Sequence, residues 1–426
     1  MAIGRPTGLR LSTAERVQKR WDESCLDDLL GPEHMARQVW AYVEGLDLSV
    51  FYKQVCTTVR SSGRSAIDPA ILMSLWLYAT LDGVGSARLL DRLCTSEAAY
   101  RWLCGGVGVN YHTLSDFRIE AGEFLDDLLS KSVAGLIEAG LIDVSTMAVD
   151  GVRVRASAGS GSFRRGERLE QLYEAARQAV EKLRTEVEED PGSAQRRRTA
   201  RRQVVAEDRL RRLEEARAAH AEIEQHRQQQ DASQRRKTPR NGKPARASTS
   251  DAQARVMKMA DGGYRPAYNP QIKTTPSGAH IIGLSVTNIG SDQGLLEPAV
   301  AEIEQRYGVR PERVLADGGY SSKDDIEGLH AEGIELFCPL PNNTKGDPAA
   351  PRRGDGPGAL AWRQRMATPQ GKATYRQRFA TERPHAHMRT HGLQRLLVRG
   401  ADKVKAVMLW HVHAFNFLQF KREGWV

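Results

Sequence analysis

The sequence predicts a mixed α/β sheet domain that carries an inserted helical hairpin and follows an all-α N-terminal region. Three observations lead to this fold class. Apolar residues recur at helical spacing through most of 13–140, β-branched and apolar segments alternate with helical ones from residue 141 onward, and residues 164–246 are rich in Glu, Arg, Ala and Gln. With 426 residues, 40% of them hydrophobic, the chain is long enough for two or three domains with real cores.

Residues 1–140 form the predicted helical region. The segment DPAILMSLWLYATLDG at 68–83 places Pro where a helix starts and then apolar residues at helical spacing. Further helices are predicted from residue 13 and at 86–95, 97–103, 113–121 and 124–139. Because Arg88, Arg92, Arg101 and Arg118 lie among these segments, the region is either a helix-turn-helix type of DNA reader or a plain helical bundle with solvated arginines.

Residues 141–163 and 247–426 form the predicted sheet domain. LIDVSTMAVD is β-branched and apolar, so we expect a buried strand that ends at Asp150. AYNPQIKTT and AHIIGLSVTN, with Pro-Ser-Gly between them, predict a β-hairpin. A helix (295–307), a strand (312–317), a helix (321–332), a strand (334–340) and a mostly helical remainder follow. This order of elements is typical of a mixed sheet covered by helices.

Residues 164–246 form the predicted inserted hairpin and loop. They contain 22 Lys and Arg against 15 Asp and Glu, and so supply +7 of the net charge of +9. Two amphipathic helices joined by a turn at Pro191-Gly192-Ser193 are expected, followed by a flexible basic loop at 234–250. The arginines at 196–198, with Arg201 and Arg202, repel one another unless a negative partner is near. A purely structural coiled coil is the alternative, but the β-rich segments on both sides argue against it.

The composition favours an intracellular protein with an anionic partner. A pI of about 9.3 makes a polyanion the first partner to consider. Five scattered cysteines without a CxxC indicate neither a disulfide framework nor a zinc site, which fits a reducing cytoplasm. The first 20 residues lack the apolar core of a signal peptide, and no stretch approaches 18 apolar residues, so we expect no membrane span.

The string ADGGY occurs twice, at 260–264 and at 316–320. Asp317 ends the apolar strand VLAD, and ligands of open α/β sheets bind beyond the carboxyl ends of strands. Asp261 follows ARVMKMA, which we interpret as a connector before a strand. Because the flanking sequences differ, the two copies do not predict a structural repeat, and we expect Asp317 to carry chemistry and Asp261 to carry none.

Asp150 ends its strand in the same way as Asp317. If the two strands are neighbours, the carboxylates converge, and they repel each other unless a cation or a proton joins them. Oxygen ligands without Cys or paired His favour Mg²⁺ or Mn²⁺, and two such ions can activate a water and stabilise the leaving oxygen in phosphoryl transfer.

A third carboxylate is expected in TYRQRFATERPHAHMR at 374–389. At about 100° per residue, Tyr375, Arg378, Glu382 and Arg389 fall on one helix face, which offers a metal ligand flanked by phosphate-binding groups. Pro384 is expected to kink this helix because its ring clashes with the carbonyl of residue 380. His385, His387 and His391 are interpreted as solvated or phosphate-facing and not as a metal site.

These motifs resemble the bacterial insertion-sequence DDE transposases, whose catalytic domain is ribonuclease-H-like. Tyr375-x2-Arg378-x3-Glu382-x6-Arg389 is similar to the family's Y-x2-R-x3-E-x6-K signature, with Arg in place of the last Lys. AVDG and LADGGY resemble the two aspartate motifs, and YNPQ at 268–271 resembles the YN-x-Q block of one branch. LQRLLVRG, LWHVHAFNFLQF and the helical segments before residue 120 are similar to other parts of the family. ERPHAHMR departs from the family's more usual Phe-Gly pair after the Pro.

The resemblance implies residue roles and partners. Asp150, Asp317 and Glu382 would form the catalytic metal triad, with two Mg²⁺ or Mn²⁺ ions. It also implies contacts to double-stranded DNA from Tyr375, Arg378 and Arg389. Apart from the resemblance, DNA contacts are also expected from Arg153, Arg118 and Arg88.

The function expected from this resemblance is transposition in the bacterial cytoplasm, by a homodimer on DNA. The enzyme would bind the terminal inverted repeats of its element, hydrolyse the phosphodiester at each end and transfer the strand to target DNA. Two alternatives remain open. One is a nuclease of the same fold that cuts without joining, and the other is a catalytically silent DNA-binding protein derived from a transposase.

Overall fold

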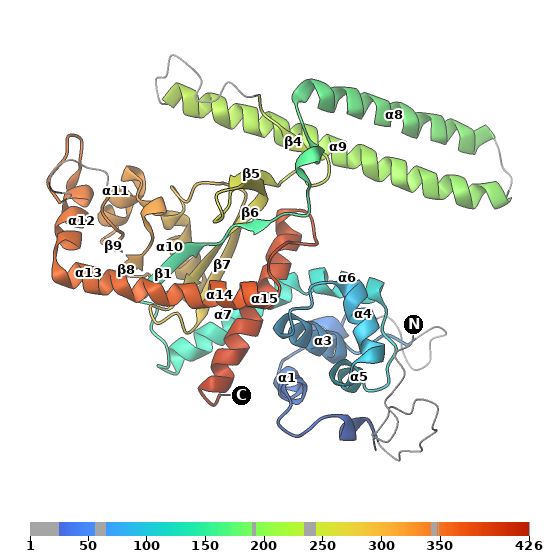
Figure 1. Cartoon of the computed structure of the whole chain (residues 1–426), viewed down its shortest axis with the longest axis horizontal. Helices are drawn as coiled ribbons and strands as arrows, with labels where there is room; N and C mark the ends of the chain where they lie inside the picture. The colour runs from blue at the N-terminus through green and yellow to red at the C-terminus, as the bar shows by residue number, and fades with distance from the viewer. Residues whose placement is uncertain are drawn as a thin grey trace, which may run out of the picture.

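The computed structural model describes residues 25–55, 65–189, 193–233, 244–341, 347 and 349–425 (Figure 1). The start of the helical region at 13–24, the turn at 190–192 and residues 234–243 of the basic loop lie outside the described residues. The side chains of the arginines at 196–198 lie outside them as well.

The N-terminal region is helical, as predicted. Its elements are η1 (Leu26–Leu29), α1 (Met35–Glu44), α2 (Ser49–Tyr52), α3 (Pro69–Leu81), α4 (Ala87–Ser96), α5 (Ala98–Cys104), α6 (Tyr111–Glu120) and α7 (Gly122–Glu138). The side chain of Asp68 caps α3 by accepting from the backbone N–H of Ala70, and Pro69 occupies the first helical position. Most residues of α3 are buried, so this helix forms the centre of the region.

A mixed sheet follows. Its strands are β1 (Thr146–Gly151), β2 (Val154–Arg155), β5 (Arg255–Lys258), β6 (Tyr264–Thr274), β7 (Ile281–Thr287), β8 (Arg313–Leu315) and β9 (Glu335–Phe337), while β3 (Phe163–Arg164) pairs with β4 (Ala247–Ser248) apart from it. The order β2-β6-β1-β8-β9 places antiparallel β6 on one side of β1 and parallel β8 on the other. β5 and β7 also pair with β6, and the β6–β7 pairing confirms the predicted hairpin.

The remaining helices are α10 (Leu296–Tyr307), α11 (Lys323–Ala331), α12 (Pro357–Ala367), α13 (Pro369–Arg376), η4 (Gln377–Thr381), α14 (Glu382–Thr390) and α15 (Ala401–Arg422). α15 is buried on nearly all sides. Its Trp410 donates to the carbonyl of Arg118 in the helical region at 3.0 Å, and its Asn416 bonds both backbone groups of Ile281 in β7 at 2.9 Å. One hydrophobic core therefore runs from the N-terminal helices into the sheet.

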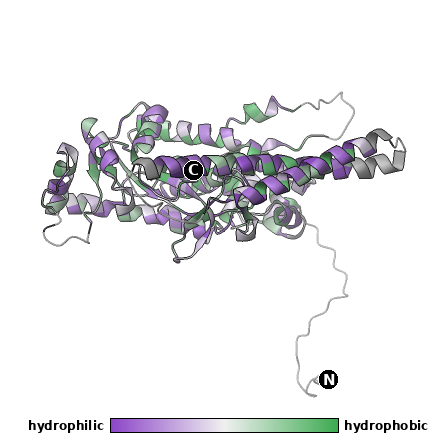
Figure 2. Ribbon diagram, turned by 90° about the horizontal axis from the view of Figure 1, so that it is seen from above, coloured by the Kyte–Doolittle hydropathy of each residue, from purple (hydrophilic) through white to green (hydrophobic). Residues whose placement is uncertain are grey.

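Two long helices, α8 (Gly166–Glu189) and α9 (Ser193–Ser233), lie side by side between β3 and β4 in the chain. Their ion pairs show an antiparallel arrangement, because Glu170 pairs with Arg217 near one end and Arg184 with Glu207 nearer the other. The pair extends from the body of the protein and is hydrophilic along much of its length (Figure 2). Its small apolar core, which includes Leu169 and Leu213, is separate from the main core.

One sequence-based assignment was wrong. Residues 255–258, interpreted as part of a connector, form β5, which pairs with the start of β6. The alternation of side chains in this strand is weak, since it is short and only Met257 of its four residues is buried, so the pattern of a half-buried strand is hard to recognise. None of the helices in the described ranges has the length and apolar character that crossing a membrane requires.

Candidate active site

Two aspartates meet at the carboxyl ends of neighbouring parallel strands. Asp150 lies near the end of β1, and Asp317 lies two residues beyond β8. The register of this pair sets Thr146 beside Arg313 and Ala148 beside Leu315, so the two strands point the same way and end together. The apolar residues of both strands are buried in the core, which fixes where the acidic side chains emerge.

Arg378 lies between the two carboxylates. Its Nη2 is 3.1 Å from Oδ2 of Asp150 and 3.8 Å from Oδ2 of Asp317. Only 11% of the Arg378 side chain and 14% of the Asp150 side chain are exposed, so the ion pair is largely removed from water. Such a pair persists only when each charge has a partner, and here one cation serves two anions.

Burial, more than any neighbouring charge, sets the pKa of Asp150. Burial raises the pKa of Asp150 to about 6, Arg378 opposes the shift, and Asp317 adds to it. A carboxyl held this way releases its proton more easily once a further cation is near. Oxygen donors fit a hard divalent ion such as Mg²⁺, with Asp150 and Asp317 as the residues that would hold it.

The structure does not bring the third predicted carboxylate to this pair. Glu382 is exposed at the first position of α14. Among the described residues, no group of three or more His, Cys, Asp and Glu side chains is placed to hold a metal ion. Asp150 and Asp317 are therefore assembled in this structure, and Glu382 is not.

The helix that carries Glu382 changes its twist just before it. The predicted continuous helix is divided into α13, the 3-10 segment η4 and α14. A 3-10 turn advances about 120° per residue instead of about 100°. Through η4 this places Glu382 roughly 110° around the axis from Arg378, whereas His385 returns to within roughly 50° of it. The predicted stripe assumed uniform α-helix, which explains why Arg378 faces Asp150 and Glu382 does not.

Pro384 and Gly278 account for this change of twist. Pro384 has no N–H to donate to the carbonyl of Ala380, so an α-helical bond is missing where η4 gives way to α14. That carbonyl lies against Gly278, in the turn between β6 and β7, so closely that a Cβ at Gly278 would collide with it. Gly278 has φ +62°, a second reason for glycine at this position.

His385 lies beside Asp150, whereas the sequence suggested a solvated or phosphate-facing residue. Its Nδ1 lies 3.5 Å from Oδ2 of Asp150, and only 8% of the residue is exposed. Burial lowers its pKa to about 4, with Arg389 and Arg378 acting in the same direction, so the ring is neutral at pH 7. His387 is also partly buried, with its ring 4.1 Å from that of His391. The solvated interpretation was wrong for His385 because it ignored how tightly α14 packs on the core, and the phosphate-facing interpretation stays a prediction.

A polar cluster behind the two aspartates was not foreseen. Asp292 accepts from Asn269 at 2.7 Å and from Gln271 at 3.2 Å, both in β6, and from Arg153 at 3.0 Å. The carbonyl oxygen of Gln271 in turn accepts from the hydroxyl of Tyr320. Sequence reasoning treated YNPQ as a family likeness only, and its two amides projecting from one strand were the signal that could have located this cluster.

The six predicted DNA contacts have different surroundings. Arg389 and Arg88 are exposed, and Arg88 stacks on the ring of Tyr111. Tyr375 is half-buried, and burial raises its pKa. Arg378 and Arg153 are engaged by Asp150 and Asp292.

Arg118 lies inside the protein. Only 8% of it is exposed, it donates to the carbonyl of Gly85 at 2.6 Å, and it packs on the ring of Trp76. Burial lowers its pKa to about 10. In this structure Arg118 joins parts of the helical region to one another.

Asp261 lies in the turn between β5 and β6. It is exposed, and its Oδ1 accepts from Arg265 at 2.7 Å and from the backbone of Gly263 at 3.0 Å. These partners hold its pKa below the usual value. Every contact of this carboxylate is therefore with its own turn.

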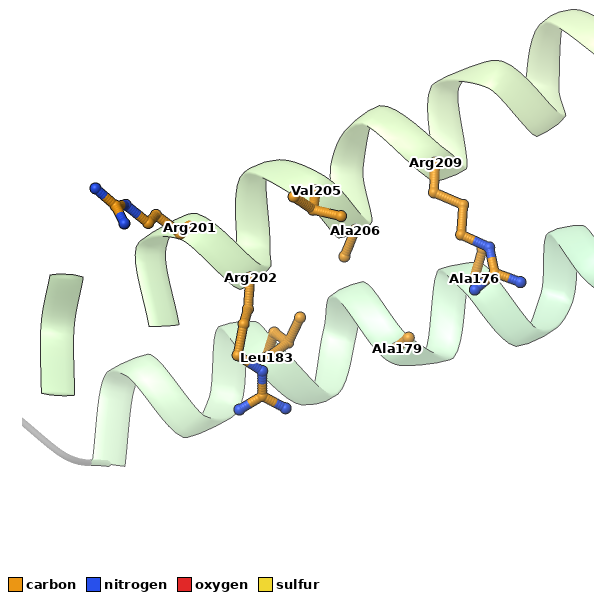
Figure 3. Close-up of a pocket in the computed structure, with 8 residues that line it drawn as sticks. All are labelled: Ala176, Ala179, Leu183, Arg201, Arg202, Val205, Ala206 and Arg209. Carbon is orange, nitrogen blue, oxygen red and sulfur yellow. The ribbon is translucent and has the colours of Figure 1, made fainter. Parts of the chain in front are cut away.

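The α8–α9 pair carries an open groove of about 410 Å³ (Figure 3). Alanines and Leu183 form its apolar floor, and Arg202 and Arg209 reach across it toward α8, whereas Arg201 points away. Val205 on its rim is 66% exposed. Its apolar floor and lack of acidic or nucleophilic groups set this groove apart from the paired aspartates.

Two family models match the chain. A model described as a transposase domain (DUF772) matches residues 24–120, and a model described as the transposase DDE domain matches residues 232–417. Asp317 and Glu382 lie within the second match, whereas Asp150 lies between the two. No curated protein and no solved structure matches the chain.

Proposed function

Because this chain belongs to the insertion-sequence DDE transposases, we propose that it binds the terminal inverted repeats of its element, hydrolyses the phosphodiester at each end and transfers the strand to target DNA. Membership of the branch with the Tyr375-x2-Arg378-x3-Glu382 signature and a ribonuclease-H-like architecture are parts of this proposal. Its place of action would be the DNA of the bacterial cytoplasm.

The observation that carries the proposal is the convergence of Asp150 and Asp317 at the ends of two parallel strands, with one guanidinium between them. Divalent ions bound here would supply an activated water and stabilise the leaving oxygen. The two carboxylates orient the reacting groups, and the buried walls of β1 and β8 keep them in place. Neutral His385 lines the Asp150 side without adding positive charge.

Glu382 is the proposed third carboxylate. Restoring α-helical twist through η4 would turn Glu382 by roughly 70° toward the face that Arg378 now occupies. Substituting Glu382→Gln is expected to abolish cleavage and to leave the resting structure unchanged, because the side chain is exposed there.

DNA binding is proposed for several basic surfaces. Arg389 is exposed on α14, Tyr375 lies on α13, Arg88 lies on the helical region, and the α8–α9 pair carries Arg201 and further arginines. Contacts between these cations and phosphates would release counterions, so affinity should fall steeply as salt rises. Because two ends must be joined, the active species is proposed to be a homodimer on DNA.

The test uses the full chain and a duplex that carries a terminal inverted repeat from DNA flanking the gene. We expect nicking at the repeat end with Mg²⁺ and, with pre-cut ends, joining to a target plasmid. Asp150→Asn should abolish both reactions and retain the gel shift. Cleavage by Asp150→Asn at the wild-type rate would refute the assignment, and cutting without joining would indicate a nuclease.

One observation favours a second candidate, a catalytically silent DNA-binding protein. Glu382 lies outside the assembled pair, and Pro384 stabilises the twist that keeps it there. Under this alternative the gel shift persists, but neither Mg²⁺ nor Mn²⁺ supports nicking by the unmodified chain.

A further inference from the structure

We propose that Asp292 is a positioning residue for the Asp150–Asp317 pair, holding the two aspartates at the separation that a divalent ion requires. This inference rests on the proposed metal-dependent function and names a fourth acidic residue beyond the triad. Asp292 lies beyond β7, and 13% of its side chain is exposed.

Asp292 lies beside a glycine that is close in sequence to each aspartate. Gly151 follows Asp150, and a Cβ at Gly151 would come within 3.0 Å of Oδ1 of Asp292. Gly319 lies two residues after Asp317, and a Cβ there would come within 3.5 Å of Oδ2 of Asp292. One carboxylate therefore fills the space between the two segments, each oxygen against one of them.

Hydrogen bonds lock this carboxylate in place. Oδ1 accepts from the side-chain amides of Asn269 and Gln271, and Oδ2 accepts from Arg153. All three donors point at Asp292, which fixes the orientation of both amides, since only their nitrogen atoms can donate to a carboxylate. Arg153, which is also a predicted DNA contact, neutralises Asp292.

The orientation of Gln271 connects Asp292 to the turn that carries Asp317. With its nitrogen on Asp292, the carbonyl oxygen of Gln271 is directed to the hydroxyl of Tyr320, which is fully buried. Tyr320 belongs to the short 3-10 turn that Asp317 caps. Gln271, in β6, is also the direct strand partner of Gly151 in β1. Asp292, Gln271 and Tyr320 thus form one connected chain that joins the two aspartates from behind.

Metal affinity measures this role independently of DNA cleavage. Groups that orient metal ligands typically change affinity by 10–100-fold when they are removed. We expect Asp292→Asn to weaken Mn²⁺ binding to the full chain by that factor in titration calorimetry, because its amide nitrogen faces donors. Tyr320→Phe should weaken Mn²⁺ binding less, and the double variant should resemble Asp292→Asn alone, because both changes break the same connected chain.

Asp251→Asn is the matched control. Asp251 is a buried carboxylate that accepts from the hydroxyl of Tyr268, in the same strand as Asn269 and Gln271, but it contacts neither aspartate segment in the described structure. It should lower thermal stability and leave Mn²⁺ affinity unchanged.

Three results would overturn the proposal. Wild-type Mn²⁺ affinity in Asp292→Asn excludes a positioning role. A loss as large as that of Asp317→Asn, fully additive with Tyr320→Phe, assigns Asp292 as a direct ligand instead. Unchanged affinity in Asp317→Asn itself would show that the proposed metal function fails, which separates that failure from a failure of Asp292 alone.

Discussion

The two ADGGY segments share one hydrogen bond and have opposite surroundings. In each copy the aspartate Oδ1 accepts from the backbone N–H two residues on, at 2.7 Å for Asp317 and 3.0 Å for Asp261. Tyr320 of one copy is fully buried, whereas Tyr264 of the other is 70% exposed. One copy leaves a parallel strand beside Asp150, and the other closes a hairpin. The shared letters therefore fix only the bond from the aspartate to the glycine N–H, and the preceding strand determines whether the carboxylate has a chemical neighbour.

The largest expected difference between the two copies is in the rate of DNA cleavage after substitution of their aspartates. Asp317→Asn is expected to reduce nicking of a terminal-repeat duplex by on the order of 10³-fold, about 4 kcal/mol of lost transition-state stabilisation. Asp261→Asn should remain within twofold of the unmodified chain, because its contacts stay within its own turn. Rates under single-turnover conditions provide the measurement, and equal losses in both variants would contradict the comparison.

The pH dependence of folding stability should differ between Asp150, the carboxylate beside Asp317, and Asp261. The pKa of Asp150 is raised from 3.8 to about 6 in the folded chain. Between about pH 4 and pH 6, Asp150 is therefore protonated in the folded chain and ionised in the unfolded chain. Stability therefore falls as pH rises from about 4 to 6, by about 3 kcal/mol. Asp150→Asn should raise the unfolding midpoint at pH 8 and leave it unchanged near pH 4.

For Asp261, the expected change of folding stability with pH has the opposite sign. Its pKa is lowered by Arg265 and Gly263, so its contribution is present above pH 4 and is lost as pH falls. Since this carboxylate is fully exposed, Asp261→Asn should barely change the midpoint at any pH. A rise in the midpoint at pH 8 in both variants would show that burial of Asp150 is not the cause.

Mg²⁺ should raise the thermal stability of the chain by binding the Asp150–Asp317 pair, and Asp261 should play no part in this. At 100 times its dissociation constant, a ligand that binds only the folded state adds about 2.7 kcal/mol. We expect a rise of the thermal midpoint with Mg²⁺ at pH 8, absent in Asp317→Asn and retained in Asp261→Asn. Calorimetric scans with and without the ion check this, and a similar rise in Asp317→Asn would place the ion elsewhere.

The tyrosines should give the smallest difference. Tyr320→Phe leaves the carbonyl oxygen of Gln271 without its donor in a buried site, at a cost of about 1–3 kcal/mol. Tyr264→Phe changes an exposed residue, for which effects usually stay within about 0.5 kcal/mol. Denaturant titration measures both, and equal midpoints would mean that the Tyr320 hydroxyl contributes little.

Sequence patterns predicted the elements better than their side-chain geometry. Apolar strands and helices of the sheet domain were found within a few residues, because burial imposes a periodicity that the letters carry. The meeting of Asp150 and Asp317 followed once β1 and β8 were neighbours. The position of Glu382 did not follow, since the twist of η4 depends on the missing donor of Pro384 and on contact with Gly278, residues about 100 positions apart.

Polar contacts between residues far apart in the chain were also not predicted from the sequence. Arg118 and Arg153 look like surface arginines in the sequence, yet the first is buried on Trp76 and the second is paired with Asp292. Nothing in the local pattern distinguishes an arginine that faces solvent from one that meets a carboxylate 139 residues away. Such contacts arise only when the sheet brings distant segments together.

Helix α15 packs against both the helical region and the sheet, and this has a consequence for folding during translation. This helix emerges from the ribosome after every other described element, yet it contacts both the N-terminal helices and β7. Until it arrives, α3 and β7 lack part of their apolar cover and remain exposed to misassembly or to chaperones. A nascent polypeptide that stalls before residue 401 would therefore have no completed interior.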